Sequence, residues 1–454
     1  MQQLPQVPPP RGPLPGPGVR PVARGRRGPA ERLRQAASTA PGRLRLGAIA
    51  LVLLVLASGA LTGWQVVSRT QAADQVLTHS QPLSQNAAEI YRSLADADTT
   101  AAAGFLLAGN EPRSVRQRYE TDLATASRLL SQAAAQTTAS SQAQGWVSEL
   151  NQQLPVYAGL VETARANDRQ GLPLGAAYLR YASDQMQNQL LPVAQRLSDY
   201  EVAQVGRDYG DAQATPWAAY GLGVLVLAAL LWFQFKLFTR TNRVFNAGLL
   251  GATAAVLVTL LWLAAGTLSA DSSLTESRTR GATPLRALNV ARTEALQART
   301  AEDFNLVARG STTAYAEQWA KFTGLLAPAS GAGGLSEALR LAPAGAGPAV
   351  TDAQAQYGLW TRRHKDASDK NDQGDYQGAL DATVGTGADS AGPAYEAMDA
   401  KLAQAADIEK ADFLSAATSG RDATSIVVYG AGLLALLAAA GVLTGIGRRL
   451  AEYR

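Results

Sequence analysis

The chain has 454 residues, of which 47% are hydrophobic and only 17% are charged, too few for the surface of an ordinary soluble protein of this size. It has no cysteine and only two histidines, which excludes disulfides and cysteine-ligated zinc and leaves little material for a histidine-based metal site or catalytic triad. We therefore expect an integral membrane protein that is not an enzyme and binds no cofactor or metal. His364 lies in Arg362-Arg363-His364-Lys365, which predicts an exposed cationic helix face.

Residues 1–45 contain ten prolines and nine arginines against one acidic residue, Glu31. Such a composition cannot bury a core, so it predicts a disordered cytoplasmic tail. The simplest role of this tail is to set the orientation of the protein in the membrane. The alternative is a site for a cytoplasmic partner or for anionic lipid headgroups, with Arg26 and Arg27 as candidate contacts.

Four apolar runs contain no Asp, Glu, Lys or Arg, and each has roughly the 20 residues that a helix needs to cross a membrane. The first run is too long for the core of a signal peptide and is followed by no clear cleavage site. The sequence thus predicts four transmembrane helices, namely Leu46–Val67, Trp217–Phe235, Val244–Leu268 and Ile426–Ile446. In residue numbers these are 46–67, 217–235, 244–268 and 426–446.

The charges are divided unequally between the segments that connect these runs. Segments 1–45, 236–243 and 447–454 carry 15 basic and 2 acidic residues, whereas 69–216 and 269–425 carry 26 basic and 35 acidic residues. Because cytoplasmic loops are enriched in Lys and Arg, we expect a multi-pass plasma-membrane protein with both termini inside and two large segments outside. This orientation accounts for the basic charge without nucleic acid. The candidate cytoplasmic contacts are Lys236, Arg240, Arg243, Arg448 and Arg449.

Both outer segments carry apolar residues at alternating steps of three and four, which predicts helices that pack along a continuous seam. In the first segment, turn residues divide the pattern into helices over about 69–108, 111–137, 140–168 and 173–215. The second segment is looser, with a long loop around a short helix at 328–349 and another break between Gly385 and Pro393. The seam residues are Leu83, Ala87, Ile90, Leu94, Ala97, Ala101, Met186, Leu190, Val193, Leu197, Tyr200, Tyr395, Met398, Leu402 and Ala405.

The two halves show the same landmarks in the same order, at offsets that drift from 202 to 209 residues. Pro82-Leu83 matches Pro284-Leu285, and Tyr220-Gly221 matches Tyr429-Gly430. This order indicates a parallel duplication. The predicted fold is an all-α membrane protein with four transmembrane helices and two duplicated extracytoplasmic four-helix bundles. Gly59-x-x-x-Gly63 and Gly441-x-x-x-Gly445 are typical of close helix packing in lipid, and a homo-oligomer is left open.

The helix lengths place two turns of each outer segment far from the membrane, at what we call the distal tips. We expect an external protein to dock there, although capping and chain reversal alone would also account for these residue types. The candidate docking residues are Asn110, Asn167, Asp168, Asn371 and Asp372.

This order of spans and outer segments resembles GlnX, an actinobacterial membrane-protein family. The resemblance rests on topology, duplication and composition over most of the chain, and no residue motif is carried over. It implies a non-catalytic relay of amino-acid sensing between an extracellular solute-binding lipoprotein and a cytoplasmic Ser/Thr protein kinase. Two other classes compete: a direct small-molecule sensor with chemoreceptor-like bundles, and an envelope scaffold or transport accessory subunit.

Overall fold

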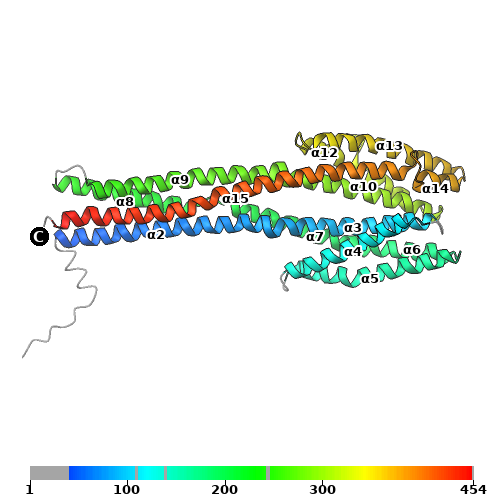
Figure 1. Ribbon diagram of the computed structural model, residues 1–454, viewed down its shortest axis with the longest axis horizontal. Coiled ribbons are helices and arrows are strands. Elements are labelled where there is room, and N and C mark those ends of the chain that lie inside the picture. The colour runs from blue at the N-terminus through cyan, green and yellow to red at the C-terminus, as the bar shows by residue number, and fades with distance from the viewer. Residues whose placement is uncertain (1–39, 108–110, 138–140, 242–245, 452–454) are drawn as a thin grey trace, which may run out of the picture.

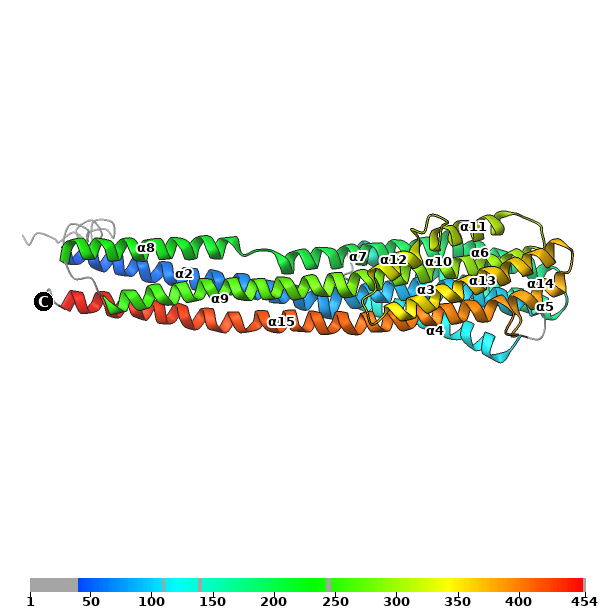
Figure 2. The same ribbon diagram turned by 90° about the horizontal axis from the view of Figure 1, so that it is seen from above.

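The computed structural model describes residues 40–107, 111–137, 141–241 and 246–451. Within these ranges all regular secondary structure is helical. The molecule is elongated: long apolar helices form one end, and shorter helices gather around their extensions at the other (Figures 1 and 2). The predicted all-helical class is therefore confirmed.

The first half of the chain has the four outer helices that the turn residues predict, and the first and fourth run on into the apolar end. Apart from Tyr200, which is half-buried, the seam residues of this half are buried. The helices are α2 (Ala40–Gln75), η1 (Val76–Ser80), α3 (Gln81–Leu106), α4 (Arg113–Gln136), α5 (Gln142–Arg169), α6 (Leu174–Gln185), η2 (Met186–Leu190), α7 (Leu191–Gln213) and α8 (Trp217–Thr241).

The second half follows a similar path with more breaks. A short helix lies within the expected loop at 328–349, and the last helix begins only after the break at 385–390. The helices are α9 (Ala247–Ser277), η3 (Arg278–Ala282), α10 (Thr283–Ala308), α11 (Ala314–Leu326), α12 (Gly334–Leu341), α13 (Gly347–Asp372), α14 (Tyr376–Val384) and α15 (Ala391–Ala451).

Three prolines inside long helices are each preceded by a π-helical turn. Pro82, Pro192 and Pro284 follow η1, η2 and η3 by two residues, and the residue between donates its backbone N–H to the carbonyl five positions back. A proline ring clashes with the carbonyl four positions back and offers no N–H, so the wider turn lets the helix continue. The prolines therefore adjust these helices without ending them.

The two halves of the chain share one hydrophobic core. The small side chains of α3 and α10 face each other, and residues of both halves join one continuous buried cluster. Ala95 and Ala298 are fully buried there. Alanine lets two helices approach closely, so the sequence pattern that suggested each bundle's own core also serves the contact between the halves.

Three helical stretches are long and apolar enough to cross a membrane: Gly42–Leu106, Leu174–Thr239 and Ala247–Ala308. Their inner faces pack with α15 into a second apolar cluster, while large hydrophobic side chains such as Leu53 and Leu436 point outward. This arrangement is compatible with a membrane protein. The predicted span 426–446 lies in α15, but most side chains between 419 and 431 lie outside the described part; Gly432–Arg448 is described and apolar.

The expected glycine packing is confirmed for three of the four positions. A Cβ at Gly59 would lie 2.4 Å from the Cβ of Ala435, and one at Gly441 would lie 2.7 Å from the carbonyl oxygen of Gly248. Gly445 also packs against Gly248, whereas nothing lies near Gly63. The motif therefore holds α15 against α2 and α9 within one chain.

Candidate signal-receiving site at the distal end

A cleft of about 450 Å³ opens at the distal end of the first half, and we call it the distal cleft. It lies where the end of α3, the start of α4 and the end of α5 meet. Its size is within the range of about 300–1,000 Å³ that is typical of ligand pockets. The lining residues are Gly104, Phe105, Glu111, Arg113, Arg116, Gln117, Glu120, Arg165, Asp168 and Arg169.

Two glycines shape the cleft. A Cβ at Gly104 would lie 2.5 Å from Oε1 of Glu111, so a larger residue there would displace this carboxylate from α3. Gly171 has a φ of +67° and donates its N–H to the carbonyl of Asp168, which ends α5 in a tight turn. Gly104 thus leaves room for Glu111 in the cleft, and Gly171 fixes where α5 ends.

Arg165 is the buried centre of the cleft, with 6% of its side chain exposed. Its guanidinium donates to Glu111 at 3.0 Å and to Glu162 at 2.8 Å, and it lies 4.2 Å from the centroid of the Tyr119 ring. Its Nε is buried without a hydrogen-bond partner. A buried guanidinium with two carboxylates and an aromatic ring is held rigidly, so it can present a fixed charge to the cleft.

Further arginines surround this centre. Arg116 pairs with Glu111 at 3.4 Å and with Glu162 at 3.2 Å. Arg113 and Arg169 are exposed on the rim and make no ion pair with a described carboxylate. Guanidinium groups bind carboxylates and phosphates through paired hydrogen bonds, so the rim suits an anionic group.

The predicted tip residues of the first half lie at the cleft. Asn167 uses its side chain to donate to the carbonyl of Thr163, and its own carbonyl accepts from Gln170 and Leu172, so it serves mainly to turn the chain. Asp168 lines the cleft, where partial burial raises the pKa of its carboxyl above the usual value. Asn110 lies outside the described residues.

The second half has a comparable turn at its distal tip. The carbonyl of Asn371 accepts from Gly374, whose φ of +83° ends α13 much as Gly171 ends α5. Asp372 is exposed beside it. Figures 1 and 2 place this end of α13 at the same end of the molecule as the end of α5. Both predicted tips therefore lie on one distal face.

The sequence missed a buried polar cluster in the second half. Glu302 is 2% exposed and accepts from Arg299, from the indole of Trp360 at 2.9 Å, and from Nδ1 of His364, 2.9 Å away. Burial disfavours its charge, but Arg299 and the hydrogen bonds together hold the pKa of Glu302 below its usual value. His364 also stacks on Trp319, with ring centroids 3.6 Å apart.

The prediction of an exposed His364 is therefore wrong. Its partners Glu302 and Trp319 come from α10 and α11, so the cationic sequence around it gave no sign of them. A sequence can indicate a polar cluster when its carboxylates and histidines recur at helical spacing on one helix. This cluster is instead formed by residues of different helices. Among the described residues, no group of three or more His, Asp or Glu side chains is arranged to hold a metal ion.

The candidate cytoplasmic contacts lie at the other end of the molecule. Lys236 and Arg448 are exposed near the ends of α8 and α15. Arg240 and Arg449 belong to the same two helices, with side chains outside the described part. Arg26, Arg27 and Arg243 lie outside the described residues.

Residues 72–210 match a protein-family model described as an actinobacterial sensor domain. The match covers the outer helices of the first half, including the described lining of the distal cleft. No curated protein and no solved structure matches the chain. The comparison supports an actinobacterial protein with a sensing role.

Proposed function

We propose that this chain is a non-catalytic transmembrane signalling protein that receives a stimulus at its distal face and relays it through the membrane. One observation carries this proposal. The segment that matches a sensor domain is built on helices that run without a chain break from the distal cleft into the apolar end.

One such path is α2–η1–α3, which covers 65 residues from Gly42 to Leu106. At about 1.5 Å per residue it is roughly 100 Å long. It ends beside Gly104 and Phe105, which line the distal cleft. A ligand that binds two arrangements of the cleft with different affinity would shift this helix, and the shift would reach the apolar end.

A polar clamp ties three of these helices together between the two ends. Arg69 of α2 donates through Nε to the carbonyl of Ala212, near the end of α7, at 3.0 Å, and it pairs with Asp271 of α9 at 2.6 Å. A cation at a helix C-terminus is favourable, and this one is 7% exposed. The clamp makes α2, α7 and α9 move as a unit.

Four spans, cytoplasmic termini and an internal duplication complete the proposal. Fold features at matching positions support the duplication: η1 and η3 both precede a proline, and Gly171 and Gly374 both end a helix with positive φ. The charge division of the sequence supports the orientation. An even number of spans returns the chain to the side on which it began.

The finer proposal follows the GlnX-like architecture. An extracellular solute-binding lipoprotein for amino acids docks on the distal face, and a cytoplasmic Ser/Thr protein kinase reads the span ends or the arginine-rich tail. The test is chemical crosslinking and copurification of the full chain from native membranes. We expect one binding protein and one kinase, and recovery of an ATPase or of envelope-assembly proteins alone would overturn the relay.

Charge reversal locates the docking surface. Asp168→Lys and Asp372→Lys should weaken recovery of the external partner and leave the melting temperature nearly unchanged, because neither residue forms an ion pair with a described cation. The matched control is Asp407→Lys on α15, which is exposed and forms no ion pair with a described cation. If both tip variants recover the partner as well as the control does, the contact lies elsewhere.

The arginines of the distal cleft favour a second candidate, a direct sensor of a small anionic solute. Isothermal titration of the purified protein with aspartate or glutamate tests it. The double variant Arg113→Ala/Arg169→Ala should abolish the binding heat, while the exposed control Arg286→Ala should retain it. Absence of any binding heat in the unmodified protein would eliminate this candidate for these two solutes.

A further inference from the structure

A second cavity lies between α2 and α8 at the apolar end, and we call it the α2–α8 groove. It has a volume of about 480 Å³. Its walls come from residues one helical turn apart on each helix, so it follows the helix axes. The wall residues are Leu44, Gly47, Ala50, Leu51 and Leu54 of α2 and Ala229, Trp232, Phe233 and Leu237 of α8.

The two helices meet tightly at one side of the groove. A Cβ at Gly47 would lie 2.6 Å from Cε2 of Phe233, so the ring packs directly against the backbone of α2. Phe233 is 9% exposed, whereas Trp232 beside it is 61% exposed. The contact between Gly47 and Phe233 therefore closes the inner side of the groove. The exposed side chain of Trp232 lies at its outer, open side.

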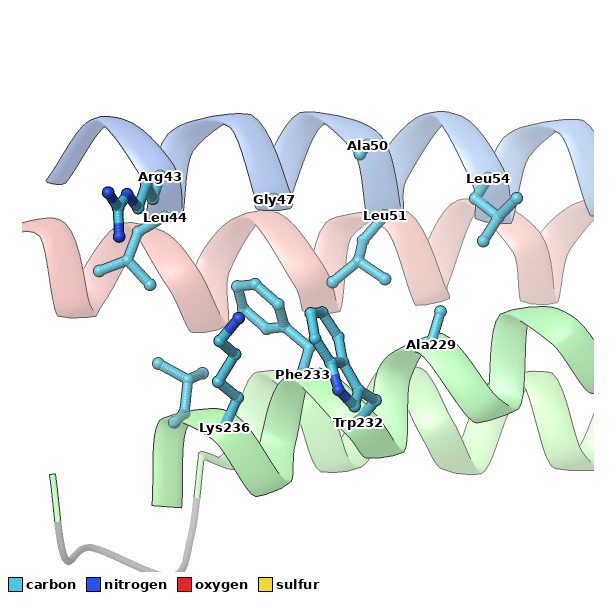
Figure 3. A pocket seen from close by; sticks show the side chains of 11 residues that line it. Arg43, Leu44, Gly47, Ala50, Leu51, Leu54, Ala229, Trp232, Phe233 and Lys236 are labelled. Carbon is cyan, nitrogen blue, oxygen red and sulfur yellow. The ribbon is translucent and has the colours of Figure 1, made fainter. Parts of the chain in front are cut away.

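Two cations lie together at one end of this apolar surface. Figure 3 shows Arg43 beside Leu44 on α2 and Lys236 beside Phe233 and Trp232 on α8. Lys236 also lies over the Trp232 ring, 4.4 Å from its centroid. Among the described residues, no carboxylate lines the groove. An apolar channel with two cations at its mouth is complementary to a molecule with a hydrocarbon chain and an anionic head.

We propose that the α2–α8 groove binds an anionic phospholipid. An acyl chain lies along the leucines and Phe233, and the phosphate lies between the guanidinium of Arg43 and the ammonium of Lys236. Both cations adjoin the basic segments of the chain, which the charge division places in the anionic cytoplasmic leaflet. The bound lipid would link α2 to α8, the first and last helices of the first half of the chain. This role does not depend on the identity of the external or cytoplasmic partner.

Native mass spectrometry of the full-length, delipidated protein tests this proposal. We expect phosphatidylglycerol to bind more tightly than phosphatidylcholine by roughly 30-fold, because each basic residue near the surface contributes about five-fold. The variant Arg43→Gln/Lys236→Gln should lose most of this preference. Arg45, Arg240 and Arg243 remain to keep the orientation.

The matched control is Arg45→Gln/Arg448→Gln, which removes two exposed cations that do not line the groove. It should keep the preference for phosphatidylglycerol. Ala50→Trp, which fills the groove, should reduce retention of phosphatidylglycerol. The proposal is overturned if the groove variant keeps the preference, if phosphatidylcholine binds the unmodified protein equally well, or if glycerol phosphate without acyl chains binds as tightly as the lipid.

Discussion

Thr99 of α3 and Thr300 of α10 share a hydrogen bond between their hydroxyl groups, with 2.6 Å between the two Oγ1 atoms. Both residues are buried at the contact between the halves of the chain. Each hydroxyl also lies within hydrogen-bond distance of a carbonyl in its own helix, that of Ala95 or Leu296. The two hydroxyl protons are thus shared among three contacts, namely the bond between the threonines and one contact with each carbonyl. The bond between the threonines links the two halves of the chain directly.

Replacing these threonines by valine should reveal that coupling. We expect Thr99→Val and Thr300→Val each to lower the free energy of unfolding by about 1–2 kcal/mol, because each removes the shared hydrogen bond together with the contact of its own hydroxyl with a carbonyl. The double variant should cost less than the sum, since the second substitution has no shared bond left to break. Thermal unfolding in detergent measures the cycle, and strictly additive values would show that the hydroxyls do not interact.

Arg165 should be far more important for stability than an exposed arginine with a similar ion pair. Arg165→Ala removes the buried partner of Glu111 and Glu162 but leaves Arg116 paired with both, so we expect a loss of roughly 2–3 kcal/mol. The control Arg280→Ala breaks an exposed pair with Glu276 and should cost about 0–1 kcal/mol. Chemical unfolding compares the two, and equal losses would contradict a structural role for Arg165 in the cleft.

Asp98 should make the protein less stable as pH rises from about 4 to about 6. Burial raises the pKa of Asp98 to about 6, although Gln187, Ser183 and Tyr157 donate hydrogen bonds that lower it. Between its unfolded pKa and this value the folded state holds the extra proton, so raising the pH favours unfolding by at most about 1.4 kcal/mol per pH unit.

The variant Asp98→Asn removes this titration and nearly preserves the shape of the side chain. Its melting temperature should therefore depend less on pH between 4 and 6 than that of the unmodified protein. Asp352→Asn, at an exposed position on α13, is the control and should leave the pH dependence unchanged. Identical pH profiles for all three proteins would show that Asp98 titrates normally.

Local helix structure could be predicted from the sequence because it depends on neighbouring residues. The seam that contains Leu94 and Leu197 is buried as expected. The breaks between α3 and α4 and between α5 and α6 fall where the glycines and prolines indicate. The distal position of Asp168 followed from helix length alone. These features need only periodicity, breakers and the rise of an α-helix.

Contacts between distant helices could not be predicted in this way. The Arg165 centre joins residues from the start of α4 and the end of α5, and the His364 cluster joins three helices. The Ala-rich face of α3 reads as bundle core, but nothing in the sequence says that α10 covers it. Pro82 and Pro284 lie inside continuous helices, and nothing in the sequence indicates the π-helical turn that precedes each.

Single-cysteine labelling tests the central claim most directly, because the chain has no native cysteine. Ser311 is exposed near the distal tip of α10, and Arg448 is exposed near the opposite end of α15. A membrane-impermeant thiol reagent on intact cells should label Ser311→Cys without permeabilisation and Arg448→Cys only after it. Labelling of both cysteines from outside, or of neither until the cells are opened, would contradict a protein that carries a signal across the membrane.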